Sequence, residues 1–188
     1  LLRHPDRWDG WRQSRVGFSA EKELKDGGRF SLQAGTYDGS GDDTFYSGIV
    51  LDVPTRYPFE ISGTNLLAKW SQNLSPTHGT DLQVYWDHAY GDGLQVRESR
   101  DTYDVEYQHR SVLDRHRIIW GAGYRYYTDD MKNSEVLTWT PLSAVTHVAN
   151  TFIQDEIALR PDRLRLTLGS KLEHNSYTGY EIEPNARL

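Results

Sequence analysis

The chain has 188 residues, and its 21 Lys and Arg against 27 Asp and Glu give a formal net charge of −6. This acidic balance, without any basic run, argues against nucleic acid as a partner. The chain has no Cys, which excludes disulfides, thiolate metal sites and a cysteine nucleophile. No run of about 18 apolar residues predicts a transmembrane helix. The mean hydropathy of −0.72 is low, but aromatic residues reach 12%, so we expect a folded chain.

Apolar and polar residues alternate with period 2 in segments of about ten residues, which predicts β-strands. The first strand ends in Lys25-Asp26-Gly27-Gly28, a sequence typical of a tight hairpin turn. The predicted strands cover about 11–24, 30–35, 66–73, 82–87, 103–110, 118–126, 153–159 and 164–173, and Asn185–Leu188 opens a ninth. Short turns at 25–28, 75–79, 113–116 and 160–163 alternate with longer polar connections at about 37–64, 91–101, 128–147 and from 175 onward.

In each predicted strand one set of alternate residues is apolar, and the other set is too polar for the inside of a soluble protein. A small β-sandwich also has one wet face, but its strands usually run about five or six residues. Segments of about ten to twelve residues are long enough to cross a bilayer at a tilt of about 45°. The pattern therefore favours an all-β fold, an antiparallel transmembrane β-barrel with an apolar outer face and a wet lumen.

In such a barrel the short turns face the periplasm and the long connections face the outside. Aromatic residues near the strand ends would form interfacial girdles, and the candidates are Trp11, Trp86, Tyr90, Tyr103, Tyr126 and Tyr127. One residue departs from the pattern, because Asp155 shares the parity of Ile153 and Ile157 and would put a carboxylate on the lipid side. We therefore expect a bulge or a change of register near Asp155.

Phe152–Ile157 is followed, after a Pro-Asp-Arg turn, by Leu164–His174. These two segments resemble the mid-barrel hairpin of TonB-dependent outer-membrane receptors of the ferric siderophore and colicin type, in which a Phe/Tyr-x-Gln-Asp strand leads into a Leu-Thr-Leu-Gly strand. Tyr177–Leu188 is similar to the segment that opens the next strand, with its Glu-Pro-x-Ala-Arg-Leu ending. The stretch from Arg15 to Gly39 is also similar to the family.

The resemblance implies that residues 1–188 are part of the barrel domain of such a receptor, with the plug domain absent. About eight complete strands and a partial ninth would belong to a larger barrel of about 22 strands. The implied location is the bacterial outer membrane, in contact with its lipid. The implied function is active import of a scarce, bulky nutrient, with a ferric siderophore as the leading candidate, energised by the TonB complex through the missing plug.

No constellation of catalytic residues stands out in the sequence. The seven His lie singly, without a metal-ligand partner at close spacing, and the Asp42-Asp43 pair lacks the spacing of a calcium loop. Same-parity carboxylates such as Asp104 and Glu106 suit a polar lumen wall better than acid–base catalysis. We therefore expect no enzyme activity, no cofactor and no metal site.

A ferric siderophore is anionic and aromatic, so Arg and Tyr in the extracellular connections suit it by charge pairing and stacking. The candidate ligand-binding residues are Tyr46, Arg56, Tyr57, Arg97, Arg100 and Tyr127. The sequence does not identify the ligand.

Other classes of protein remain open at this point. A passive or structural outer-membrane barrel would have the same strands, and closure as an eight-stranded barrel is a variant of it. A soluble carbohydrate-binding β-module is favoured by the many aromatic residues. An outer-membrane esterase is a remote further alternative, since no order of Ser, His and acid is convincing.

Overall fold

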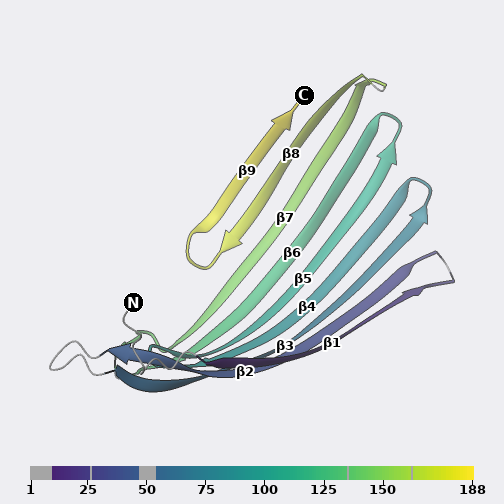
Figure 1. Ribbon diagram of the computed structural model, residues 1–188. Coiled ribbons are helices and arrows are strands. Elements are labelled where there is room, and N and C mark those ends of the chain that lie inside the picture. Colours follow the sequence, from purple (N-terminus) through teal and green to yellow (C-terminus); the bar gives the residue numbers. More distant parts are fainter. Residues whose placement is uncertain (1–9, 26, 47–53, 135, 162) are drawn as a thin grey trace, which may run out of the picture.

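The computed structural model describes residues 10–25, 27–46, 54–134, 136–161 and 163–188. These residues form one antiparallel sheet of nine strands, in which each strand pairs with its neighbours in sequence (Figure 1). The strands are β1 (Trp11–Glu23), β2 (Arg29–Tyr46), β3 (Pro54–Ser75), β4 (His78–Asp92), β5 (Arg97–Leu113), β6 (His116–Lys132), β7 (Ser143–Arg160), β8 (Leu164–Asn175) and β9 (Gly179–Arg187). The predicted all-β, antiparallel fold class is confirmed.

The sheet is strongly curved, and the short turns gather at one end of it, which we call the turn end (Figure 1). The opposite end, which carries the other connections, is the loop end. Among the described residues, β1 pairs with β2 alone and β9 with β8 alone, so these two strands are the edges of the sheet. The sheet is therefore open, and it does not close as an eight-stranded barrel.

No hydrophobic residue is buried anywhere in the described part of the chain. Apart from glycines, the buried residues of the described chain are polar: Thr80, Asp104, Thr146 and Thr167. Leu164 and Leu168 remain 38% and 44% exposed, because no second layer covers them. This distribution is the reverse of a soluble two-layer sandwich, whose apolar residues would be enclosed between the layers.

Residues that pair directly across the strands share one face of the sheet, so the register defines two faces. The apolar face carries a row that runs from Ala20 through Leu32, Ala68, Val84, Val105 and Tyr124 to Ala149. The polar face carries the alternate row, from Glu21 through Ser31, Lys69, Gln83, Glu106, Gly123 and Asn150 to Glu173. The predicted separation of apolar and polar side chains is confirmed on every strand pair in these rows.

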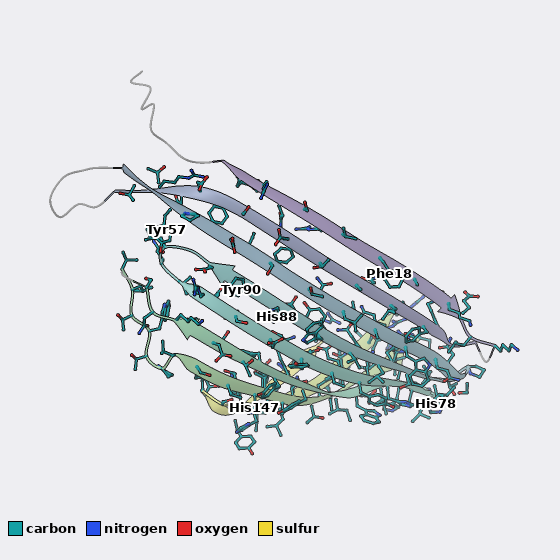
Figure 2. The ribbon with its side chains drawn as sticks, turned by 90° about the horizontal axis from the view of Figure 1, so that it is seen from below. Phe18, Tyr57, His78, His88, Tyr90 and His147 are labelled. Atoms are coloured by element: carbon teal, nitrogen blue, oxygen red, sulfur yellow. The ribbon has the colours of Figure 1, made fainter. Side chains whose placement is uncertain are left out.

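Aromatic side chains form two belts on the apolar face. The loop-end belt joins Tyr103, Tyr126 and His147, with ring centroids 6.1 and 5.1 Å apart, and Trp86 pairs directly with Tyr103. The turn-end belt comprises His78, His109, Trp120 and Tyr107, whose neighbouring ring centroids lie 5.6 to 5.8 Å apart. In Figure 2 His78 lies at the turn end, while Tyr57 and Tyr90 lie towards the loop end.

Four of the six predicted girdle residues lie on the apolar face, namely Trp86, Tyr90, Tyr103 and Tyr126. The other two predictions are wrong, because Trp11 pairs with Gly41 and Tyr127 with Thr102 on the polar face. Residue type alone suggested all six, whereas parity decides which face each side chain occupies.

Most of the predicted long connections belong to strands. β2 extends to Tyr46 and β3 begins at Pro54, so much of 37–64 is hydrogen-bonded ladder. The predicted 91–101 connection shrinks to 93–96, the 128–147 connection to 133–142, and the loop from 175 onward to a short turn before β9. At about 3.3 Å per residue, the 22 residues of β3 extend about 70 Å, more than twice the bilayer's hydrocarbon thickness of about 30 Å.

Asp155 lies in an unbroken register with Ile118 and Leu168, so the bulge predicted there is wrong. The irregularity in β7 lies between Ala158 and Arg160 instead. Asp155 keeps its place on the apolar face because its Oδ2 lies 2.6 Å from Nδ1 of His116. Its Oδ1 is buried and has no hydrogen-bond partner among the described residues. A partner on the neighbouring strand, near the turn end, thus replaces the expected change of register.

Candidate functional site

The polar face holds several of its ionisable side chains in cross-strand pairs. Arg125 donates to Asp104 at 2.8 Å, and the Asp104 side chain is only 7% exposed. Arg110 lies 3.6 Å from Asp81. Because these partners sit on neighbouring strands, the pairs fix the register as well as neutralise the charges. Most of this wall therefore presents hydrogen-bonding groups without a large net charge.

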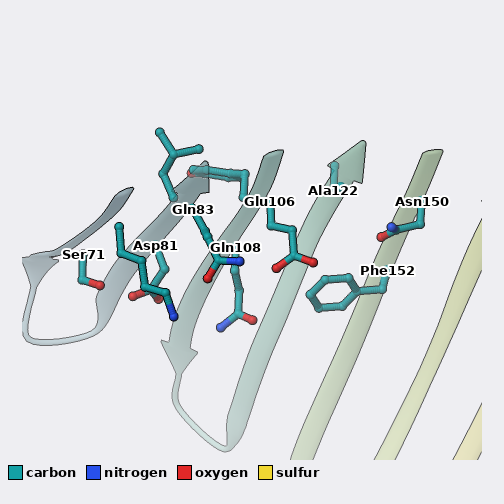
Figure 3. Close-up of a pocket in the computed structure, with 12 residues that line it drawn as sticks. Ser71, Asp81, Gln83, Glu106, Gln108, Ala122, Asn150 and Phe152 are labelled. Atoms are coloured by element: carbon teal, nitrogen blue, oxygen red, sulfur yellow. The ribbon is translucent and has the colours of Figure 1, made fainter. Parts of the chain in front are cut away.

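A hollow of about 460 Å³ lies over β3 to β7 in the turn-end half of the polar face, and we call it the turn-end hollow. Figure 3 shows Gln83, Glu106 and Gln108 projecting into it from adjacent strands. The Phe152 ring covers the backbone of Gly121, where a Cβ would stand 2.7 Å from the ring. This hollow offers amides and carboxylates around one aromatic ring, which suits a hydrogen-bonding ligand or peptide segment.

A second hollow, of about 510 Å³, lies at the loop end and is called the loop-end hollow. Its floor is aromatic and apolar, formed by Tyr57, Phe59 and Ile61 of β3. Gly91 and Gly93 leave the neighbouring positions without side chains, and the Phe59 Cβ lies 3.7 Å from where a Gly93 Cβ would stand. Glycine near the end of β4, at Gly91, and just after it, at Gly93, leaves space that larger side chains would occupy.

Three of the predicted ligand-binding residues, Tyr57, Arg100 and Tyr127, lie on the polar face. The Arg100 guanidinium carbon lies 6.0 Å from the centre of the Tyr127 ring, so the structure brings these two together. Arg100 also forms an ion pair with Asp129, its direct partner on β6. Tyr57 is placed separately, in the floor of the loop-end hollow.

Arg56 and Arg97 lie on the parity of the apolar face, at the loop end. Arg56 donates two hydrogen bonds to Asp42, at 2.8 and 2.7 Å, which lower the pKa of the Asp42 carboxyl and raise the pKa of Arg56. Asp92 accepts from Arg97 at 2.5 Å and raises its pKa in the same way. Tyr46 ends β2, and its side chain lies outside the described part of the structure.

Phe59, Ile61, Asp43 and Glu98 line the loop-end hollow but were missed by sequence reasoning. A signal was present, because Tyr57, Phe59 and Ile61 alternate with period 2. Pro54 and Pro58 favoured a loop over a strand at this place, since proline is rare inside a sheet. In the structure Pro58 pairs with Asp42 on β2 and lies before Glu60, where the ladder with β4 begins, so β3 has a partner on only one side at this position.

Among the described residues, no group of three or more His, Asp and Glu is arranged to hold a metal ion. No helix in the same part of the chain is long and apolar enough to cross a membrane.

The single antiparallel sheet, with an exposed apolar face and a hydrogen-bonding polar face, has the architecture of an outer-membrane β-barrel wall. No protein-family model matches the chain, and no curated protein matches it. Among solved structures, the chain is similar to the siderophore receptor PirA from Pseudomonas aeruginosa, with a TM-score of 0.52 and 15% identity over 93% of the chain. The chain spans 36% of the length of that receptor. At this identity the likeness establishes the fold alone.

Proposed function

We propose that residues 1–188 form part of the barrel wall of an outer-membrane transport receptor that imports a scarce, bulky nutrient. The observation that carries the proposal is the exposed apolar face bounded by two aromatic belts, with no buried hydrophobic residue in the described chain. On β6 the apolar face runs from Ile118 to Tyr126, which is about 26 Å along the strand. For a strand tilted by about 40°, this length spans about 20 Å along the membrane normal. This height is close to the apolar band of outer-membrane barrels.

In this arrangement the polar face lines the lumen, the turn end faces the periplasm and the loop end faces the outside. A ferric siderophore is the candidate cargo, supported by the likeness to a siderophore receptor. TonB and a plug domain would couple transport to energy, as the family resemblance implies. We retain Tyr57, Arg100 and Tyr127 as ligand contacts, because all three lie on the lumen side near the loop end.

The test is uptake of radioactive iron by cells that carry the complete gene and lack other siderophore receptors. We expect the protein to fractionate with the outer membrane, and we expect iron uptake to require both this gene and TonB. Uptake that continues without TonB would favour a passive barrel. Recovery of the protein in the soluble fraction, monomeric without detergent, would overturn the proposal in favour of a soluble β-module.

A further inference from the structure

A third hollow, of about 430 Å³, lies beside the turn that joins β3 to β4, and we call it the arginine hollow. His78, which lines it, marks this end of the sheet in Figure 2. On the polar face, Arg110 of β5 pairs directly with Ile119 of β6. The next pair on the same face is Val112 with Arg117. The two arginines therefore stand on one diagonal of a square, and the two apolar residues stand on the other.

Neither guanidinium in the arginine hollow makes a hydrogen bond to a described residue. Arg110 lies 3.6 Å from Asp81 and Arg117 lies 3.7 Å from Glu156, beyond the usual N–H···O range of about 2.7–3.2 Å. Glu156 instead accepts a hydrogen bond from Arg165 at 3.0 Å. Three arginines thus share two carboxylates, which leaves one positive charge and unused N–H donors. The Arg110 and Arg117 side chains are 46% and 57% exposed, so a ligand has access to both.

The neighbouring turns do not cancel this charge. In the turn between β5 and β6, Asp114 is followed by Arg115, so these two residues add no net charge. The sequence between β7 and β8, at 160–163, carries two Arg and one Asp. Asp155 lies on the opposite, apolar face of the sheet. The charge balance around the arginine hollow therefore favours an anionic ligand.

The arginine hollow is held open by a glycine and by the hydrogen bonds of a turn. Gly79 pairs directly with Arg110, and a Cβ at Gly79 would stand 2.8 Å from Nη2 of Arg110, so the guanidinium lies over the glycine. The Val112 N–H donates to the Thr77 carbonyl at 2.8 Å, which ties the β3–β4 turn to β5. The Ser75 hydroxyl accepts a hydrogen bond from the Thr77 amide at 3.2 Å. A site that is formed in advance lowers the entropic cost of binding.

The spacing of the two arginines indicates the shape of the ligand. Diagonal neighbours on adjacent strands lie about 7–8 Å apart. In an extended peptide, residues i and i+2 point to the same side and lie about 7 Å apart. Carboxylates at i and i+2 would therefore reach both guanidinium groups and accept charge-assisted hydrogen bonds from them. The methylene groups of glutamate side chains would also cover Val112 and Ile119, which a hydrated inorganic anion would leave in water.

Resting on the function proposed above, which places the turn end in the periplasm, we infer that the arginine hollow binds an extended acidic segment of a periplasmic polypeptide. Arg110 and Arg117 each bind one carboxylate of that segment, and the carboxylates belong to alternate residues. This docking surface lies at the opposite end of the polar face from Tyr57, Arg100 and Tyr127.

The experiment measures the binding of three capped pentapeptides to the full-length protein in detergent by isothermal titration calorimetry. Ser-Glu-Thr-Glu-Ser carries alternate carboxylates, Ser-Glu-Glu-Thr-Ser has the same composition and charge with adjacent carboxylates, and Ser-Gln-Thr-Gln-Ser is uncharged. We expect the alternate peptide to bind about tenfold more tightly than the uncharged peptide, and about threefold more tightly than the adjacent one. The preference for the acidic peptides should shrink as the salt concentration rises.

Variants then locate the site. Arg110→Gln combined with Arg117→Gln should bring the ratio between the alternate and uncharged peptides close to one. Arg15→Gln removes a positive charge from the polar face of β1, where Arg15 pairs with Tyr37, and should keep the tenfold ratio. The comparison of peptides on the unaltered protein remains decisive even if the double variant fails to fold.

The possible results separate the parts of the inference. Equal binding of the alternate and uncharged peptides would overturn it and leave the proposed receptor standing, since iron uptake tests the receptor independently. If the two acidic peptides bind equally, or if inorganic phosphate displaces the alternate peptide at a similar concentration, the ligand is not an extended peptide. A tenfold ratio that persists in a folded double variant would show that the site lies elsewhere.

Discussion

Replacing Gly121 by alanine should destabilise the sheet, because its position on β6 has no room for a methyl group. A Cβ there would stand 2.7 Å from the Phe152 ring and closer still to the Tyr107 carbonyl oxygen, a backbone atom that cannot rotate away. Overpacking of this kind costs about 1–3 kcal/mol, and the loss of glycine's freedom in the unfolded chain returns about 0.4–1 kcal/mol. The expected net loss is about 1–2 kcal/mol in the free energy of unfolding.

The matched control is Gly123→Ala, two residues along the same strand and on the same face. A Cβ at this position would meet Nδ2 of Asn150 at 2.9 Å, and an amide at the end of a flexible side chain can rotate away. We expect Gly123→Ala to remain within about 0.5 kcal/mol of the unaltered protein.

The assay is urea unfolding of the full-length protein in lipid vesicles, followed by Trp fluorescence and by the heat-dependent shift of folded barrels in gels. A second variant, Gly121→Ala with Phe152→Ala, removes the ring and leaves the carbonyl, and should recover part of the loss. If Gly121→Ala is as stable as Gly123→Ala, the close packing of β5, β6 and β7 around Gly121 is refuted.

Three further results are expected. Val84→Arg, in the middle of the apolar face, should cost about 2–4 kcal/mol in vesicles, whereas Gln83→Arg on the polar face should cost little, and equal costs would contradict the assignment of faces. His116→Leu should lower the free energy of unfolding by about 1–2 kcal/mol, because it leaves the Asp155 carboxylate unpaired. Adding Asp155→Leu should restore the stability. A double-mutant cycle that shows no coupling between the two positions would refute this pairing. Hydrogen bonds from Arg56 lower the pKa of the Asp42 carboxyl. The Arg56–Asp42 ion pair therefore stabilises the loop end fully at pH values above the usual aspartate pKa of about 4. This stabilisation is lost as the pH falls through the lowered pKa of Asp42. Amide exchange of β2 and β3, corrected for intrinsic rates, should show that loss on acidification, and Asp42→Asn should abolish the pH dependence.

The sequence predicted the strands wherever one face is apolar. Leu66, Ala68 and Trp70 alternate strictly, and their strand, its partners and its exposed face are all confirmed. Towards the loop end the face that is apolar elsewhere turns polar, as at Asp38 and Ser62, so the periodic signal of that face fades while the hydrogen-bonded ladder continues. Hydrophobic alternation reports where a strand has an apolar environment on one side; it does not report where backbone pairing ends.

The same limit explains what was missed in the candidate site. Residue type suggested Arg56, Arg97 and Arg100, but only the register shows that each faces a carboxylate on a neighbouring strand or across a turn. Such pairs join residues up to 29 positions apart, and a single sequence carries no information about them. Asp155 is a similar case, because its partner His116 lies 39 residues earlier in the chain.

The extension of the ladder to the loop end has a consequence for how ligand preference could change. The two described connections at 93–96 and 133–142 are tied together there, since the Ser134 hydroxyl donates to the Gln95 carbonyl at 3.2 Å and Gly93 N–H donates to the Val96 carbonyl at 3.0 Å. Connections held by such hydrogen bonds lose little conformational entropy when a ligand binds, so the entropic cost of binding is smaller. A new ligand preference would then arise from single side-chain substitutions on a rigid backbone. Insertions in these connections would lower the binding affinity before they changed the ligand preference.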